Sequence, residues 1–457
     1  MAVSGLFRRK NSYEIDMCHG PLLRQMITFA VPLIIAGILQ LLFHVADLVV
    51  IGRLASHEAL AAVGATGSIT HLLINLFIGM SVGANVLVAR YIGERSRKNI
   101  SRTVNTAIMT GIICGIALGI FGVAMARTFL TWMSTPPEVL DKAVLYMSIY
   151  FAGMPLFMVY NFGSAVMRAM GDTRRPFYYL LYGGIVNVLL NLFFVIVFKW
   201  DVAGVATATV IANGISVALV LRALYKMRGP CRIRWKTLHI EWRNLREIMR
   251  IGIPAGFQAS CFSISNILIQ SALNTFGSEA MAGNAGFASV EAFGHVVVGS
   301  ISQTVMSFVS QNYGGKQYGR LKLSLRYGTL CGWALMSVFT VVLLLLAGKV
   351  MEIFNSNPEV IRYGVMRARL IVPFFLVSVV MEVWSGAMRG LGRSLEPGLI
   401  SIFCICIFRV IWVFTVFRWN PTLLTLLTSY PVTWVLNAVG IGIMLKWVMR
   451  RMLPRES

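Results

Sequence analysis

The first feature of this sequence that could carry chemistry is a carboxylate inside an apolar stretch. Gln40, His44 and Asp47 stand at positions i, i+4 and i+7 of a run that is otherwise mostly apolar. On a helix this spacing places the three side chains on one stripe. Lipid offers no hydrogen bonds to such a stripe, so we expect it to face the interior of a helix bundle.

Three neutral oxygen donors lie in two later apolar stretches. Asn187 and Asn191 share a helix face because they are four residues apart, and Thr209 lies in the next stretch. At roughly 1.5 Å per residue, these groups and Asp47 lie at similar depths from the outer ends of their spans. One carboxylate with three neutral donors suits a small hard cation such as Na⁺, or a carboxyl that carries a proton. We therefore expect a cation-coupling site here; hydrogen bonding between packed helices is the alternative.

The second half of the sequence carries a different polar set. It consists of Asn266 with Gln270 on one face, Glu291 with His295 on another, and the single charges Glu382 and Arg409. Ionisable residues at membrane depth are costly and are functional candidates by default. We take this set, together with Gln40 and His44, as candidates for a substrate cavity or gate.

The charged members of this set have structural alternatives. Glu291 and His295 could relay protons or form a simple hydrogen-bonded pair. Arg409 could bind an anionic substrate, or it could neutralise Glu382 or Glu291. We expect the internal ion pair, because an unpaired buried charge is expensive.

Membrane-spanning helices must position these residues. Hydrophobic residues make up 57% of the chain and charged residues 13%, and the mean hydropathy is +0.73. A helix needs about 20 mostly apolar residues to cross a bilayer. Breaking the sequence at polar and Gly/Pro clusters predicts twelve spans: 26–51, 60–90, 103–127, 140–166, 177–197, 202–225, 248–274, 280–310, 323–347, 360–387, 396–417 and 424–447. Pro155 and Pro373 are expected to kink the fourth and tenth spans.

The net charge of +23 is distributed as in a membrane protein. Basic residues gather in the connections 90–102 and 222–250, whereas 52–58, 131–141 and 201–204 contain only Arg53. An excess of Lys and Arg marks the cytoplasmic side of a membrane. We therefore expect a multi-pass protein of the inner (plasma) membrane with both termini cytoplasmic, and no nucleic-acid partner.

The N-terminal segment and the cysteines indicate features that we do not expect in this protein. The segment before Pro21 contains Arg8, Arg9, Lys10 and Asp16 but no apolar core, so we expect no cleaved signal peptide. The seven cysteines show no metal or disulfide spacing. No cofactor is expected, and Na⁺ at Asp47 is the one metal ion that the sequence suggests.

The two halves of the chain repeat. Met167–Gly171 corresponds to Met388–Gly392, Pro137–Val139 to Pro358–Val360, and Pro176 to Pro397, all at the same offset in the numbering. Six spans per half make this a parallel repeat, as in some transporters. We expect an N-terminal lobe at 1–226, a cytoplasmic linker at 227–247 and a C-terminal lobe at 248–457. The fold class is thus an all-α polytopic membrane protein with two six-helix lobes.

Several motifs resemble those of multidrug and toxic-compound extrusion (MATE) transporters. They are the Pro32 span leading to Asp47, Ile51–Gly52 and Leu60–Ala62; Gly79–Gly83 with Val88–Gly93; Met167–Pro176; and Gly252–Pro254 with Gln311–Gly314. The resemblance covers nearly the whole chain and is to the prokaryotic branch. It implies twelve helices in two lobes, alternating access to a central cavity, and cation-coupled export of amphipathic organic compounds.

The resemblance also implies roles for single residues. In the branch with a coupling site in the first lobe, an Asp on helix one works with an Asn, an Asp and a Thr on helices five and six. Asp47, Asn187, Asn191 and Thr209 occupy those positions, and Asn191 departs from the pattern because that branch has a second Asp there. Another branch places a Glu in helix seven, where this sequence has Phe262. The missing carboxylate leaves H⁺ and Na⁺ both open as the coupling ion.

The expected function is antiport of drugs or other amphipathic organic compounds against H⁺ or Na⁺, by a protein that is not an enzyme and acts as a monomer. The alternative is a lipid-linked saccharide flippase or a specific metabolite exporter of the same superfamily. A flippase would need a cationic cavity for pyrophosphate, for which Arg168, Arg389 and Arg409 are the candidates. A membrane enzyme would need clustered His or carboxylates and a channel would need a filter-like loop, and neither feature is visible in the sequence.

Overall fold

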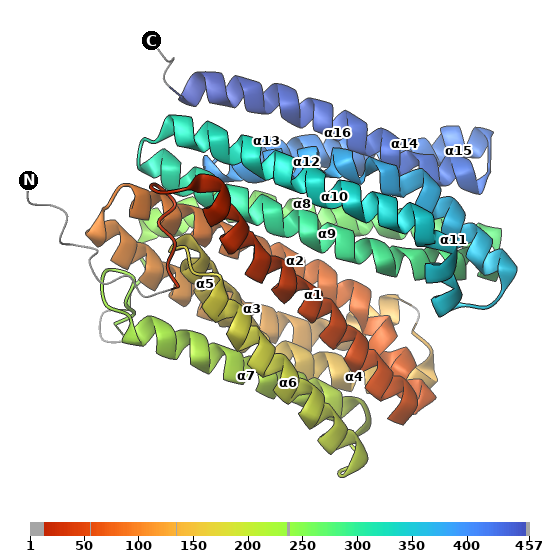
Figure 1. Cartoon of the computed structure of the whole chain (residues 1–457). Helices are drawn as coiled ribbons and strands as arrows, with labels where there is room; N and C mark the ends of the chain where they lie inside the picture. The colour runs from red at the N-terminus through yellow and green to blue at the C-terminus, as the bar shows by residue number, and fades with distance from the viewer. Residues whose placement is uncertain (1–12, 55, 134, 235–237, 454–457) are drawn as a thin grey trace, which may run out of the picture. The chain divides into compact units, whose positions relative to one another are not determined.

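The computed structural model describes residues 13–54, 56–133, 135–234 and 238–453, and all regular elements in these ranges are helical (Figure 1). In chain order they are α1 (Leu22–Leu54), α2 (His57–Gly93), α3 (Arg97–Trp132), α4 (Pro137–Ala152), α5 (Met154–Ala169), α6 (Arg174–Ile196), α7 (Asp201–Lys226), α8 (Trp242–Leu273), η2 (Asn274–Phe276), α9 (Ser278–Gly314), α10 (Tyr318–Phe354), α11 (Pro358–Ile371), η3 (Val372–Phe374), α12 (Phe375–Gly390), α13 (Leu395–Ser401), η4 (Ile402–Ile407), α14 (Phe408–Phe414), α15 (Val416–Trp419) and α16 (Leu423–Met452). The expectations about a signal peptide and the two chain ends concern residues that lie partly outside these ranges.

The helices account for the twelve predicted spans. Eleven spans of the described residues are long and apolar enough to cross a membrane, and the bent pair α4–α5 makes the twelfth. Each span overlaps one predicted range, so the all-α class with two sets of six spans is confirmed. Hydropathy is sufficient for this prediction because a chain in lipid must satisfy its backbone hydrogen bonds internally, and a helix does so within each span.

Both predicted proline positions interrupt a span. The fourth span bends by 44° between α4 and α5, with Pro155 in the first turn of α5. At this bend α3 passes so close that the backbone of Pro155 leaves no room for a side chain at Gly115. In the tenth span, Pro373 lies in the 3₁₀ turn η3 that separates α11 from α12.

The eleventh span has an irregularity that the sequence analysis did not predict. Its middle section, Ile402–Ile407, is a π-helix. The helix then continues as α14 and breaks at Thr415 before the short α15. Single π-helical turns inside α-helices are rare and are frequent at functional sites.

The chain divides into two compact units. Unit 1 comprises Met1–Gly252 with Ser310–Gln317, and unit 2 comprises Ile253–Val309 with Tyr318–Ser457. Unit 1 therefore includes the first turns of α8 and the end of α9 in addition to α1–α7.

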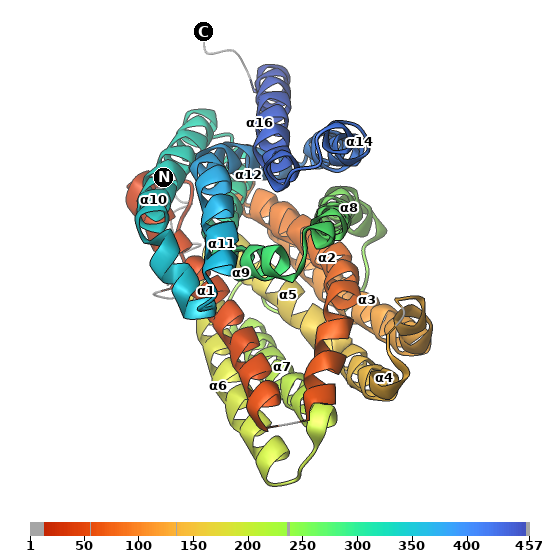
Figure 2. The same cartoon turned by 90° about the vertical axis from the view of Figure 1, so that its right-hand side faces the viewer.

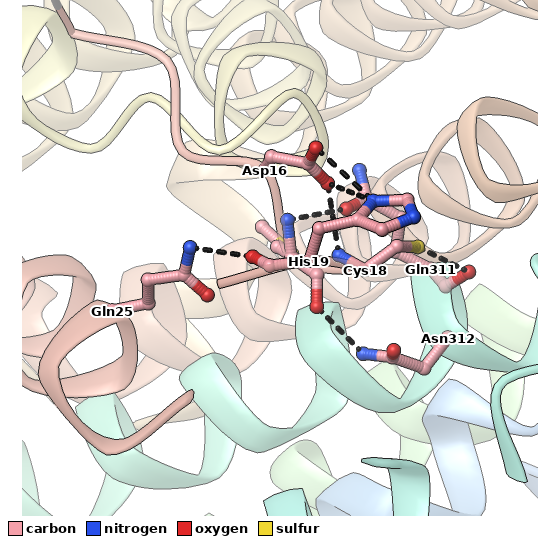
Figure 3. Close-up of polar contacts among 7 residues, drawn as sticks. Asp16, Cys18, His19, Gln25, Gln311 and Asn312 are labelled. Carbon is pink, nitrogen blue, oxygen red and sulfur yellow. Dashed lines mark hydrogen bonds and ion pairs between the residues drawn. The ribbon is translucent and has the colours of Figure 1, made fainter. Parts of the chain in front are cut away.

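Direct hydrogen bonds within unit 1 join the segment before α1 to the end of α9 (Figure 3). The Met17 backbone N–H donates to Gln311 Oε1 over 3.1 Å, and Asn312 Nδ2 donates to the Met17 carbonyl over 3.1 Å. Cys18 Sγ lies 3.6 Å from the Gln311 carbonyl oxygen, and Asp16 Oδ1 accepts from the Cys18 N–H over 3.0 Å. These contacts fix the entry to α1 against a helix that is distant in sequence.

Candidate functional site

Three helices of unit 1 position the predicted cation site, and α6 packs against both of the others, α1 and α7 (Figures 1 and 2). Two adjacent glycines on α6 allow this close approach. A Cβ atom on Gly184 would overlap the ring of Phe43 in α1, and one on Gly183 would overlap Ser216 Oγ in α7. Small residues at helix interfaces let backbones approach closely in membrane proteins. The glycine pair thus brings polar groups from all three helices within hydrogen-bonding distance.

The four predicted coupling residues meet at this junction. Asn191 Nδ2 lies 2.5 Å from Asp47 Oδ1. With its nitrogen turned toward Asp47, the Asn187 amide donates to the same Oδ1 over 2.8 Å and accepts from Thr209 Oγ1 over 3.2 Å. Asn187 and Asn191 are 6% and 0% exposed, respectively. The cluster is therefore a buried chain of hydrogen bonds that runs from the carboxylate to the hydroxyl.

The carboxylate of Asp47 has no basic partner among the described residues. In the described ranges no Lys, Arg or His nitrogen lies within 4.0 Å of its carboxylate. Asn191 Oδ1 is also buried and has no hydrogen-bond partner among these residues. No group of three His, Cys, Asp or Glu side chains in the described part of the chain could hold a metal ion. The available ligands are therefore one carboxylate with amide and hydroxyl oxygens, which suits a proton or an alkali cation better than a transition metal.

The rest of the polar stripe on α1 differs from Asp47 in exposure. Gln40 and His44 are exposed, whereas Asp47 is half-buried. Only the outermost member of the stripe therefore belongs to the buried cluster.

In unit 2 a buried ion pair involves a residue that the sequence analysis missed. Glu291 forms a two-pronged ion pair with Arg367 of α11, with Nε–Oε1 and Nη2–Oε2 distances of 2.8 and 2.6 Å. Both side chains are 6% exposed. Arg367 Nη1 also donates to Asn284 Oδ1. The expected pairing of Glu291 with His295 is thus replaced by an ion pair, since both carboxylate oxygens are bound by the guanidinium.

Arg409 lies in a second polar junction, and the ion pair predicted for it is wrong. Its Nε donates to Thr433 Oγ1 over 3.3 Å and its Nη1 to Asn266 Oδ1 over 3.1 Å. The guanidinium carbon lies 4.2 Å from the ring centroid of Tyr430. The carboxylates that were expected to neutralise it pair with other arginines, Arg367 and Arg389. Among the described residues, Arg409 is a 2%-exposed cation without a carboxylate within 4.0 Å.

The remaining candidates of unit 2 lie near these two arginines, and Gln270 is linked to Arg367 through Asn284. Gln270 accepts from Asn284 Nδ2 over 3.2 Å. Glu382 Oε2 lies 3.6 Å from Arg389 Nη2 at a partly exposed position. His295 packs against the rings of Phe375 and Trp434, at centroid distances of 5.2 and 6.0 Å. Arg367 and Arg409 both lie over the Tyr430 ring, with 5.2 and 4.2 Å between the guanidinium carbon and the ring centroid. The structure therefore gathers most of the second-half candidates around Tyr430.

The sequence did indicate that Arg367 is buried. Val360, Gly364, Arg367 and Ile371 are buried on one stripe of α11 at helical spacing. A basic residue on an otherwise apolar stripe requires a buried partner.

Comparison with known proteins agrees with the duplicated architecture. The MatE family model matches residues 32–193 and again 254–415, two equally long segments, one in each half of the chain. The probable multidrug resistance protein YoeA of Bacillus subtilis (strain 168) is 25% identical over 390 residues, which cover 84% of each chain. A FAD transporter of Shewanella oneidensis is 23% identical over 351 residues, or 75% of this chain and 76% of that protein.

Solved structures share the fold. A MOP superfamily transporter from Pyrococcus furiosus superposes with a TM-score of 0.89 at 19% identity, covering 95% of this chain and 98% of that chain. At this level of identity the likeness is evidence for the fold alone. The family model, which matches most of the chain in two copies, goes further: the protein is a member of the MatE family of multidrug and toxic-compound extrusion transporters.

Proposed function

We propose that the protein is a cation-coupled antiporter that exports amphipathic organic compounds by alternating access of its two lobes, 1–226 and 248–457. The observation that carries this proposal is the uncompensated carboxylate of Asp47, held by the amides of Asn187 and Asn191 within a membrane span. An isolated charge at this depth is costly, and binding H⁺ or Na⁺ removes the cost. The site can therefore have different charge states in different conformations.

Thermodynamics limits how a cation can be coupled to export. A cation can drive a conformational change only through its differential affinity for the two states. In the proposed cycle, the organic compound occupies the cavity, a cation from outside binds at Asp47, and binding favours the state that releases the compound outward. The basic connections support a cytoplasmic location for both termini and the linker 227–247. We further propose that the monomer is the transporting unit.

Dye efflux from proteoliposomes tests this function. Efflux of a fluorescent cationic dye is followed under an imposed pH gradient or Na⁺ gradient for the wild type and Asp47→Asn. Asp141→Asn is the matched control, because that carboxylate is 81% exposed and makes a surface ion pair with Arg127. We expect gradient-driven efflux in the wild type and the control and its loss in Asp47→Asn, with unchanged thermal unfolding. Wild-type efflux by Asp47→Asn under either gradient would refute the proposal.

Arg409 favours a second candidate, an exporter of a specific anionic metabolite. At the offset of the sequence repeat, Arg409 corresponds to Val188, the residue after Asn187, and Asn266 corresponds to Val45, the residue after His44. Thr433 lies on the last helix of its half, as Thr209 does. The second repeat thus carries a guanidinium on the helix where the first carries an amide beside a carboxylate. An unpaired guanidinium recognises carboxylate or phosphate groups, and one relative is a FAD transporter.

Inhibition of dye efflux by competing compounds distinguishes this candidate from general drug export. FAD carries phosphate groups and riboflavin does not, so inhibition of dye efflux by the two compounds compares an anionic ligand with its neutral counterpart. If the second candidate holds, FAD inhibits at lower concentration than riboflavin, and Arg409→Gln removes the difference. Equal inhibition by both compounds in the wild type would argue against an anionic substrate. A lipid-linked saccharide contains the same pyrophosphate chemistry and would compete in the same way.

A further inference from the structure

A pocket in unit 1 has no part in the proposed transport cycle. It lies where the first turns of α6 meet the last turns of α7, and its volume is about 490 Å³. Its main lining residues are Arg175 and Tyr179 of α6, Leu219, Arg222 and Lys226 of α7, and Tyr13 of the segment before α1.

Helical spacing explains why these side chains converge. Arg175 and Tyr179 are one turn apart on α6, while Leu219, Arg222 and Lys226 stand at i, i+3 and i+7 on α7. Ser216 Oγ donates to the Tyr179 carbonyl over 3.1 Å and holds the two helices together at this level. Beyond this contact the basic side chains of α7 extend along one wall of the pocket.

Two cations of the pocket have no carboxylate partner among the described residues. Arg175 pairs with Asp172 and, over 3.4 Å, with Glu14. Arg222 and Lys226 are both exposed, and no carboxylate of the described residues lies within 4.0 Å of either. A guanidinium fork and an ammonium next to two tyrosine rings form a donor set that suits a phosphate group.

The surroundings favour a phosphate that is attached to lipid. From the pocket an apolar stripe runs along α6, where Tyr182, Ile185 and Leu189 are 54%, 47% and 60% exposed. On the orientation proposed above, the pocket is at the cytoplasmic surface, where basic pockets between helices bind anionic headgroups. We propose that this pocket binds the phosphodiester headgroup of an anionic phospholipid, whose acyl chains lie along the exposed stripe of α6.

Thermal unfolding of the full chain in neutral detergent tests the site. The unfolding midpoint is titrated with phosphatidylglycerol, with phosphatidylcholine of the same acyl chains as the reference. The variant is Arg222→Gln/Lys226→Gln. The matched control is Lys446→Gln/Arg450→Gln, a Lys/Arg pair with the same four-residue spacing near the end of α16. We expect half-saturation by phosphatidylglycerol to require an about thirtyfold higher concentration in the variant, the loss expected for two basic residues, and no change in the control.

Three results would overturn the proposal. If phosphatidylglycerol binding is weakened equally in the variant and the control, the lipid responds to overall surface charge. Equal stabilisation by phosphatidylcholine would mean that the headgroup is not recognised. Glycerophosphoglycerol is the headgroup without acyl chains. If it saturates the protein at the same concentration as the lipid, the pocket binds a soluble phosphodiester instead.

Discussion

The ring of Phe43 in α1 lies against the bare backbone of Gly184 in α6, where a Cβ atom would overlap it. One turn further along α1 is Asp47, and one and two turns further along α6 are Asn187 and Asn191. The ring and the glycine therefore set the separation of the two helices at the level of the cation site, although neither is part of it.

Replacing Gly184 by alanine tests this spacing. The added methyl group must displace the Phe43 ring, and overpacking of this kind costs about 1–3 kcal/mol. We expect Gly184→Ala to lower the unfolding midpoint and to abolish most gradient-driven efflux by separating Asp47 from its amides. Gly214→Ala in α7 is the control, because its Cβ would make an ordinary 3.6 Å contact with Leu156. If both variants transport like the wild type, the glycine contact does not set the site geometry.

Asn191 offers a test of which ion binds. Asn191→Asp replaces the amide that donates to Asp47 by a second carboxylate within hydrogen-bonding distance. Two adjacent carboxylates cannot both stay ionised unless a cation lies between them. We expect NaCl to raise the unfolding midpoint of the variant more than that of the wild type, with KCl as the control salt. An identical response of both proteins to the two salts would place Asn191 outside the ion-binding shell.

For the buried Glu291–Arg367 pair, we expect single and double substitutions to differ strongly in their effect on folding stability. Glu291→Gln leaves the Arg367 guanidinium without its counter-ion, and breaking a buried pair in this way costs about 3–5 kcal/mol. Replacing both partners by apolar residues, as in Glu291→Leu/Arg367→Met, removes the charge and its desolvation together. Thermal unfolding should therefore show the double variant to be more stable than the single one. If the single variant is instead the more stable one, Arg367 finds another partner after the substitution.

The spans and the coupling cluster could be predicted from the sequence for a shared physical reason. A polar residue in lipid must face protein, so the four-residue spacing of Asn187 and Asn191 already fixed which side of α6 is buried. Their contact with Asp47 depends on how closely α1 approaches α6. The glycine pair at 183–184 allows this approach, and we did not interpret it as an interface signal.

The polar contacts of the second half could not be predicted in the same way. A sequence shows which charges exist but not which of them are adjacent, and Glu291 had three possible partners in His295, Arg367 and Arg409. Its pairing with Arg367 was decided by the packing of α11, not by any spacing in the sequence. The π-helix of Ile402–Ile407 was missed because a shift from i+4 to i+5 hydrogen bonding has no residue signature.

The hydrogen bonds between Met17, Gln311 and Asn312 impose an order on the biogenesis of the protein. Met17 and Gln311 are 294 residues apart, so at translation rates of about 5–20 residues per second the first waits roughly 15–60 s for the second to be synthesised. During that interval α1–α7 can enter the membrane, but the unit to which they belong still lacks Ser310–Gln317. The segment before α1 is thus fixed only after α8 and most of α9 have been translated, so unit 1 is completed after the synthesis of unit 2 has begun.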